Sequence, residues 1–172
     1  MKKNRKTTGF TLIEILVVIG IIAILAAIVI IAINPAKQFA QARNTQRQAG
    51  VNTILNAVGQ RIADNKGIFQ GSFNVGGNVY FCAPIPPTVG GTATAHIDVT
   101  PLTATTTTVS GDLGCLVPTY VATLPLDPDT TYAIDPYTGY DIGVDPTGRV
   151  TVCASKGAES SIPGSGPICV TR

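Results

Sequence analysis

One stretch near the N-terminus decides how the whole chain is organised. It consists of Gly9-Phe10-Thr11-Leu12-Ile13-Glu14, and it is followed by an apolar run, Ile15 to Ile33, that contains no charged side chain. The segment from Phe10 to Ile33 would form a helix of about 36 Å at roughly 1.5 Å per residue. Since the hydrocarbon core of a bilayer is about 30 Å thick, the sequence predicts one membrane-spanning helix.

The segment before the apolar run is short and basic. It contains Lys2, Lys3, Arg5 and Lys6. Because basic flanks stay on the cytoplasmic side of a membrane, we expect the N-terminus inside and the C-terminal part outside. A secretory signal peptide has a shorter apolar region that precedes its small-residue cleavage site, whereas here the small residue, Gly9, comes first. Cleavage after Gly9 would remove residues 1–9 and leave the helix intact.

Glu14 is an acidic side chain within the predicted span. A carboxylate at the centre of a membrane costs about 2.5–3.5 kcal/mol on insertion scales, and intramembrane acids usually have a partner. Cleavage after Gly9 would create such a partner, because it frees an α-ammonium group at Phe10 that could pair with Glu14 of a neighbouring copy. Alternatively, Glu14 lies near the membrane surface and reaches water.

The string from Gly9 to Glu14, with the basic leader before it and the uninterrupted apolar run after it, resembles the class III signal of type IV pilins and type II secretion pseudopilins. The resemblance extends to about Gly50. It implies that a prepilin peptidase cleaves after Gly9 and methylates the new N-terminal Phe10, and that Glu14 guides subunit docking. It also implies three kinds of assembly partner: other copies of the chain, an inner-membrane platform protein and an ATPase motor.

The residue patterns and the resemblance together predict an α+β fold, in which a long N-terminal helix packs on a small antiparallel sheet with a C-terminal disulfide loop. The expected domains are a leader (1–9), the membrane and filament-core half of the helix (10–35), its amphipathic half (36–66) and a β-rich globular domain outside the cytoplasm (67–172). Many family members have a helix-kinking proline at the position of Ile31, whereas this chain has Pro35. We therefore expect a kink or a melted turn near residues 31–35.

These features predict a structural subunit of a type IV pilus that serves adhesion or motility. The precursor would cross the cytoplasmic membrane once, and the assembled subunit would be extracellular. A type II secretion pseudopilin and a competence pilin for DNA uptake are alternatives with the same architecture, and an uncleaved membrane-anchored binding module is a remote one. We expect no enzyme, because no Ser/His/Asp or Cys/His constellation is evident. We also expect no direct nucleic-acid binding, because eight acidic residues follow Lys66 and only three basic ones do.

The second half of the predicted helix has a hydrophobic stripe. Its members, spaced at helical intervals, are Val51, Ile54, Leu55, Val58 and Ile62. This periodicity predicts a helix face that packs on the globular domain. The helix should stop at Asn65-Lys66-Gly67, with Gly67 as a left-handed cap. The sequence leaves open whether Arg43, Arg47 and Arg61 contact neighbouring subunits or are solvated.

The four cysteines all follow the apolar run. They are Cys82, Cys115, Cys153 and Cys169. No two of them form a CxxC motif and the chain has a single histidine, so a zinc site is not expected. An even number of cysteines outside the membrane predicts two disulfides. Three pairings are possible, and we favour Cys82–Cys115 and Cys153–Cys169 because each closes a Gly/Pro-containing loop between strand-like runs.

The remaining sequence predicts short strands and turns. Strands are expected at 78–82, 131–134, 139–144 and 149–154, and a loop at 83–91. Two turns begin with Asp-Pro, at 135–139 and 145–148, where the Asp can hydrogen-bond to its own backbone. The threonine-rich segment 100–110 is either an edge strand or an exposed, variable or O-glycosylated loop.

Five acidic residues lie close together in the C-terminal part of the sequence. They are Asp127, Asp129, Asp135, Asp141 and Asp145. Calcium takes six to eight oxygen ligands from such loops, so these residues are a candidate calcium site. Three of them precede proline, and turn initiation explains those three without a metal ion. His96, the single histidine, is expected to be a surface or packing residue.

Overall fold

The computed structural model describes residues 9–75, 78–89, 93, 95–98, 113–129, 131 and 137–172. The chain forms two compact units, residues 1–38 and residues 39–172. The first unit contains helix α1 (Leu12–Ile33), and helix α2 (Pro35–Asp64) begins in it and continues through the second unit.

Asn34 separates the two helices, within the range 31–35 where the sequence predicts an interruption. It has the left-handed backbone conformation, with φ of 48°, that ends α1, and asparagine tolerates this conformation better than most residues. The same residue caps the start of α2, because its carbonyl oxygen accepts a hydrogen bond from the backbone N–H of Lys37 at 3.1 Å. Pro35 then occupies the first position of α2, where its missing N–H costs no helical hydrogen bond.

The C-terminal end of α2 is also where the sequence predicts it. Gly67 has a φ of 91°, and its N–H donates to the carbonyl oxygen of Ile62 at 2.8 Å. This bond satisfies one of the carbonyl groups that a helix leaves without a partner at its C-terminus. The chain then turns towards the first strand.

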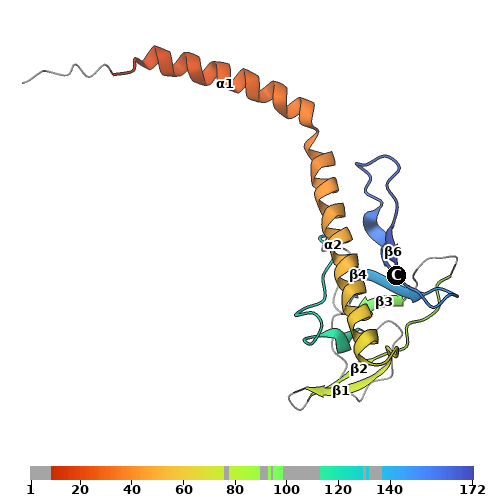
Figure 1. Ribbon diagram of the computed structural model, residues 1–172. Coiled ribbons are helices and arrows are strands. Elements are labelled where there is room, and N and C mark those ends of the chain that lie inside the picture. The colour runs from red at the N-terminus through yellow and green to blue at the C-terminus, as the bar shows by residue number, and fades with distance from the viewer. Residues whose placement is uncertain are drawn as a thin grey trace, which may run out of the picture. The chain divides into compact units, whose positions relative to one another are not determined.

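Two antiparallel sheets follow in the second unit (Figure 1). The smaller sheet is a hairpin of β1 (Gly71–Val75) and β2 (Asn78–Cys82). The larger has the order β3-β4-β5-β6. Its strands are β3 (Ala95–Asp98), β4 (Tyr137–Val144), β5 (Val150–Ala154) and β6 (Ile168–Thr171), and two 3₁₀ turns, η1 (Gly114–Leu116) and η2 (Ser155–Gly157), complete the fold. The predicted α+β class is confirmed.

Strand β4 begins earlier than the sequence predicts, because Tyr137 and Thr138 belong to the strand and not to a turn. The pairing with β3 explains the difference: His96 lies opposite Asp141 and Asp98 opposite Tyr137, so β4 has two extra residues there. Gly139, with φ of 90°, lies inside this irregularity. The glycine that suggested a turn therefore serves a bulge, a feature that bends a strand and increases its twist.

Three further expectations for the β region have different outcomes. The segment Cys153 to Cys169 is not a loop throughout, because its end belongs to β6, which pairs with β5. Strand β3 is not predicted from the sequence at all. The threonine-rich segment 100–110 lies outside the described residues, and so does the expected strand 131–134 apart from its first residue.

The hydrophobic stripe of α2 packs against the sheet, as predicted. Val51, Ile54, Leu55 and Val58 are buried, and they share one core with strand residues such as Ile142 and Val152. The contact is closest at Gly50, where an added Cβ would lie 2.4 Å from the hydroxyl oxygen of Tyr140. A side chain at position 50 would therefore displace the tyrosine ring from the core.

A buried arginine on α2 joins two loops of the second unit. Arg47 donates two parallel hydrogen bonds to Asp127, from Nε at 2.8 Å and from Nη2 at 2.9 Å. Its Nη1 donates to Glu159 and to Asn44. The side chain of Arg47 is 1% exposed and that of Asp127 is fully buried. Such fork-like pairing of arginine with carboxylate is among the strong hydrogen bonds of proteins, because both partners are charged and two bonds form in parallel.

The two other arginines of α2 also bind within the chain. Arg43 donates to both oxygens of Glu159, at 2.8 and 2.6 Å. Arg61 is buried and donates from Nε to the carbonyl oxygen of Phe69 at 3.0 Å. Neither of the roles considered from the sequence, contact with a neighbour or solvation, therefore describes Arg47 and Arg61. The acceptors of Arg47 lie in loops distant in sequence, and those of Arg61 lie in the segment that follows α2.

Replacing Arg47 by leucine should destabilise the second unit strongly. The substitution leaves Asp127 buried without its counter-ion, and breaking a buried pair in this way costs about 3–5 kcal/mol. Denaturant unfolding of the full chain in detergent measures the loss. The matched control is Arg149→Leu, because Arg149 is 64% exposed in its pair with Asp145 and such pairs contribute about 0–1 kcal/mol. Equal losses for the two variants would contradict this account.

The hydrogen bonds of Arg43 and Arg47 to Glu159 also make the free energy of unfolding depend on pH. Hydrogen bonds from Arg43, and then from Arg47, lower the pKa of Glu159 from 4.5 to about 2. A carboxyl group whose folded pKa is lowered stabilises the fold above its ordinary pKa, and the contribution disappears as the pH falls through the folded value. The free energy of unfolding should therefore fall between pH 4.5 and about 2, and it should fall less in Glu159→Gln. Asp145, whose pKa is lowered to about 2 by Thr147, is present in both proteins and cancels in the comparison. Parallel pH curves would rule out this role for Glu159.

Candidate processing and assembly site

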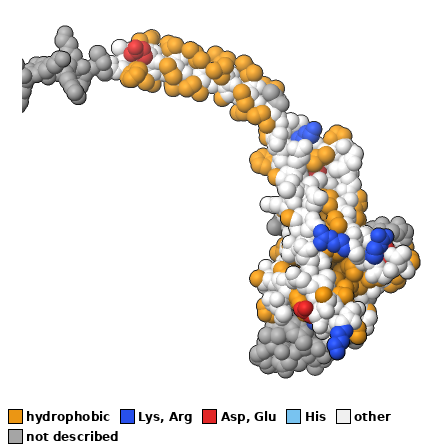
Figure 2. Space-filling view, in the orientation of Figure 1, with side chains coloured by type: hydrophobic (Ala, Val, Ile, Leu, Met, Phe, Trp, Pro, Cys, Tyr) orange, Lys and Arg blue, Asp and Glu red, His pale blue; other side chains and the backbone are white. Residues whose placement is uncertain are grey.

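Helix α1 exposes apolar side chains around its whole circumference. Leu12, Val17, Ile24 and Ile30 are all more than half exposed, and the same holds for most of their large apolar neighbours. Figure 2 shows apolar side chains along the visible face of this helix, with acidic atoms at its N-terminal end. The stretch Leu12–Ile31 is long and apolar enough to cross a membrane, with a mean hydropathy of 3.2. Such a surface needs lipid or other protein against it.

The start of α1 is fixed by hydrogen bonds between Thr11 and Glu14. The hydroxyl oxygen of Thr11 accepts from the backbone N–H of Glu14 at 3.3 Å, and Oε2 of Glu14 accepts from the backbone N–H of Thr11 at 2.7 Å. Together these form a capping box, in which two N–H groups at the helix start receive partners. The Thr-x-x-Glu spacing at 11–14 carries this signal, which our reading of the sequence did not use.

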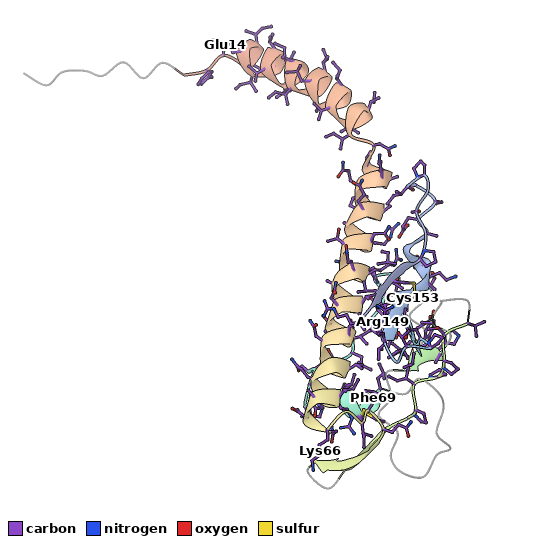
Figure 3. All side chains as sticks on the ribbon, turned by 45° about the vertical axis from the view of Figure 1, so that its right-hand side comes forward. Glu14, Lys66, Phe69, Arg149 and Cys153 are labelled. Carbon is purple, nitrogen blue, oxygen red and sulfur yellow. A yellow bond between two sulfur atoms is a disulfide. The ribbon has the colours of Figure 1, made fainter. Side chains whose placement is uncertain are left out.

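The capping box determines where the Glu14 carboxylate lies. Its Oε2 also accepts from the Thr11 hydroxyl at 2.7 Å, whereas Oε1 accepts no hydrogen bond from any residue that the structure describes. The carboxylate is thus held at the N-terminal end of α1 (Figure 3), next to the residue that would carry a new α-amine after cleavage. Together with Glu14, the side chains of Phe10, Ile13, Val17 and Val18 line a shallow, mostly apolar hollow. The α-ammonium group of a neighbouring copy could therefore reach the Oε1 atom of Glu14 across an apolar surface.

The cysteines form two disulfides in the second unit. Cys82 is joined to Cys115, with their Cα atoms 5.1 Å apart, and Cys153 to Cys169, with their Cα atoms 4.1 Å apart. These are the two pairs that the sequence favours. The second disulfide links directly opposite residues of β5 and β6, and it closes a loop that contains Glu159. This loop is held on α2 by Arg43 and Arg47.

The aspartates considered for calcium are engaged in separate interactions. Asp127 is paired with Arg47. Asp129 and Asp145 accept hydrogen bonds from residues two positions later, Thr131 and Thr147, as in Asx turns. Asp135 lies outside the described residues. Within the described ranges, no group of three or more His, Cys, Asp or Glu side chains is arranged to hold a metal ion.

Asp141 has a different environment, next to the single histidine of the chain. It accepts a hydrogen bond from Tyr137 at 3.1 Å and another from Ser155, and one of its oxygens lies 2.6 Å from Nδ1 of His96. The side chain of His96 is 68% exposed and its ring lies 4.3 Å from that of Tyr137. His96 is a surface residue, as expected.

Comparison with known proteins bears on the N-terminal segment alone. Residues 4–30 match the family model described as the prokaryotic N-terminal methylation motif. No curated protein and no solved structure matches the chain significantly. The matched residues contain the capping box and most of the apolar helix whose geometry is described above. The motif therefore supports placing this chain in the family of type IV pilins and pseudopilins.

Proposed function

We propose that this chain is a structural subunit of a type IV pilus filament, cleaved after Gly9, N-methylated at Phe10 and assembled through α1. One observation carries the proposal. Helix α1 exposes apolar side chains on all sides, and the capping box holds the carboxylate of Glu14 in its first turn. The N-terminal methylation motif covers this same segment. A structural role agrees with both features.

Assembly would cover the apolar surface of α1 and would also give the Glu14 carboxylate a partner of opposite charge. In the membrane the apolar side chains of α1 face lipid, and in a fibre they would face the same side chains of other copies. The ammonium group at Phe10 of one copy would pair with Oε1 of Glu14 in the next. A buried charge pair offsets the cost of leaving water only when its geometry and hydrogen bonds are good, but a charge left unpaired there is costly, so this pair would fix the axial register of neighbouring copies.

The remaining parts of the proposal concern topology and partners. The precursor would span the cytoplasmic membrane once with its basic leader inside, so residues 67–172 would lie outside. A prepilin peptidase, a membrane platform protein and an ATPase motor would process and assemble it. The surface loops, including the disulfide loop between Cys153 and Cys169, would serve adhesion or motility.

A pseudopilin of type II secretion is the second candidate, because the same N-terminal motif fits both systems. The two disulfides of the globular unit are our reason to prefer a filament exposed at the cell surface, where oxidising conditions make such bonds useful. A competence pilin shares this architecture. An uncleaved membrane anchor would retain residues 1–9.

Replacing Glu14 by glutamine should abolish fibre assembly without affecting cleavage. The variant leaves the α-ammonium group of a neighbour unpaired in a dry bundle, a loss of about 3–5 kcal/mol, which is roughly a hundredfold or more in assembly. The amount of the chain in sheared fibres, relative to the amount of processed chain in the membrane, measures the effect. Asp64→Asn is the control, because Asp64 is an exposed acid near the end of α2.

Two results would count against this role of Glu14. Normal fibre yield in Glu14→Gln would show that the proposed ion pair is dispensable. A variant that accumulates with its leader attached would instead place the effect on processing.

A further inference from the structure

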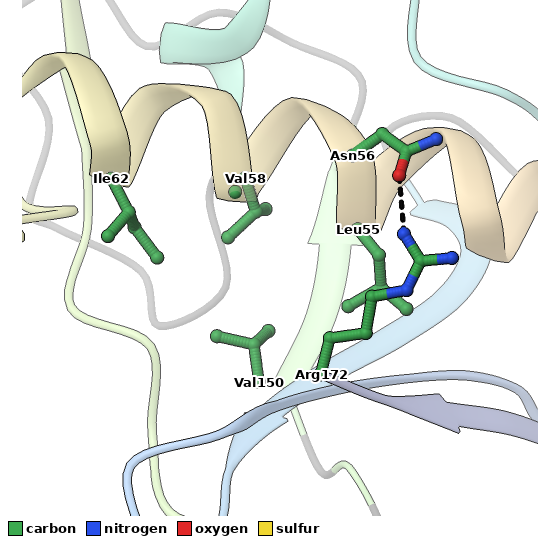
Figure 4. A pocket seen from close by; sticks show the side chains of 7 residues that line it. Leu55, Asn56, Val58, Ile62, Val150 and Arg172 are labelled. Carbon is green, nitrogen blue, oxygen red and sulfur yellow. Dashed lines mark hydrogen bonds between the residues drawn. The ribbon is translucent and has the colours of Figure 1, made fainter.

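The second unit contains an apolar groove between α2 and the sheet. It has a volume of about 330 Å³ and is lined by Leu55, Asn56, Val58, Gly59, Ile62, Val150 and Arg172. Figure 4 shows Leu55, Val58 and Ile62 pointing from α2 towards the side of the groove that holds Val150, with the guanidinium of Arg172 at one end of the groove, beside Asn56. This guanidinium hydrogen-bonds to the side-chain oxygens of Asn56 and Asn52. Both acceptors are neutral amides, and no acidic side chain is among the described residues that line the groove.

One exposed aromatic side chain of the same unit matches this groove. Phe39 lies near the start of α2 and is 67% exposed. Among the side chains that the structure describes in this unit, the other large apolar ones that are exposed are aliphatic: Ile68, Val89 and Leu126. An aromatic ring gains more than they do from such a groove, because its edge packs against aliphatic side chains and its face attracts a guanidinium group.

Phe39 and the groove lie on different sides of α2 and at different heights along it. An α-helix turns by about 100° and rises by about 1.5 Å per residue. Position 59 is therefore about 30 Å from position 39 along the helix. The groove positions 55, 58, 59 and 62 lie between about 100° and 200° around the axis from Phe39. Phe39 thus cannot enter the groove of its own copy.

The same arrangement determines what kind of assembly the contact would make. In a two-fold dimer each copy would have to insert Phe39 and receive Phe39 on one shared face. Here the two features point to different sides, so each copy can insert into one neighbour and receive from another. Such head-to-tail contacts produce rings when the rotation between copies closes and open helical filaments when it does not, and the proposed fibre is of the second kind.

We propose that Phe39 of one copy inserts into the groove of a second copy, with its ring next to the guanidinium of Arg172, as a lateral contact between globular units in the fibre. The inference rests on the proposed polymerisation, and it adds a contact that is independent of Glu14 and α1. The occupant of the groove is a second copy of this chain.

Photo-cross-linking in intact fibres tests the contact. The full-length chain carries p-benzoylphenylalanine in place of Phe39, and light- and heavy-isotope copies are mixed so that cross-links between copies can be recognised. We expect mixed-isotope cross-links that map to residues 55–62, 150 or 172. The control places the same probe at Gln41, which is exposed on the same helix but faces about 200° away, and which should give none of these products.

A second variant closes the groove without disturbing the fold. A Cβ added at Gly59 meets no atom within 4 Å, so Gly59→Leu can fill the groove from α2. It should reduce the groove cross-link from position 39 by about tenfold or more, the effect expected when an aromatic side chain loses its burial. Arg172→Gln should reduce it less, because it removes the cation and keeps the apolar floor.

The outcomes separate this contact from the proposed function. Fibres that contain methylated Phe10 but give position-39 cross-links elsewhere, to lipid or to another protein, would overturn the contact and leave the pilin role intact. An unchanged cross-link in Gly59→Leu would also overturn it. A chain that forms no fibres at all would overturn both.

Discussion

The exposed apolar surface of α1 is the constraint on which the rest of this molecule depends. Water cannot solvate a helix of this kind favourably, so it must be covered by lipid or by other copies. The capping box at Thr11 and Glu14 lets the helix start with its N–H groups satisfied while a carboxylate remains at its end. Asn34 ends the helix with a left-handed turn and starts α2 in the same step. Residues 39–172 form a separate compact unit, which its own contacts hold together.

Arg47 provides the central contact of that unit. It lies on α2, binds the buried Asp127 of one loop and reaches Glu159 in the loop closed by the Cys153–Cys169 disulfide. A buried ion pair of this kind is weak evidence for stability by itself, but it is costly to break. Its effect is therefore to make one arrangement of the loops on α2 strongly preferred over others.

The sequence predicted the helices well because their signals are local. Apolar run length, the Asn34–Pro35 pair and the left-handed Gly67 each act within a few residues. The β region was harder, because its features depend on distant partners: Gly139 serves a bulge opposite β3 rather than a turn, and β6 pairs with β5 across the disulfide. The acceptors of Arg47 and Arg61 come from loops that no periodicity connects to α2. At the candidate site, Phe10 and Glu14 were predicted from spacing, whereas the role of Thr11 required the geometry of the helix start.

The measurement that tests the central claim most directly is mass spectrometry of the N-terminal peptide of this protein in sheared surface fibres. The account predicts an N-methylated Phe10 as the first residue, with residues 1–9 absent. Processed chains found only in the membrane fraction would favour a pseudopilin or a minor subunit. A leader still attached in every fraction would contradict the account and indicate a plain membrane anchor.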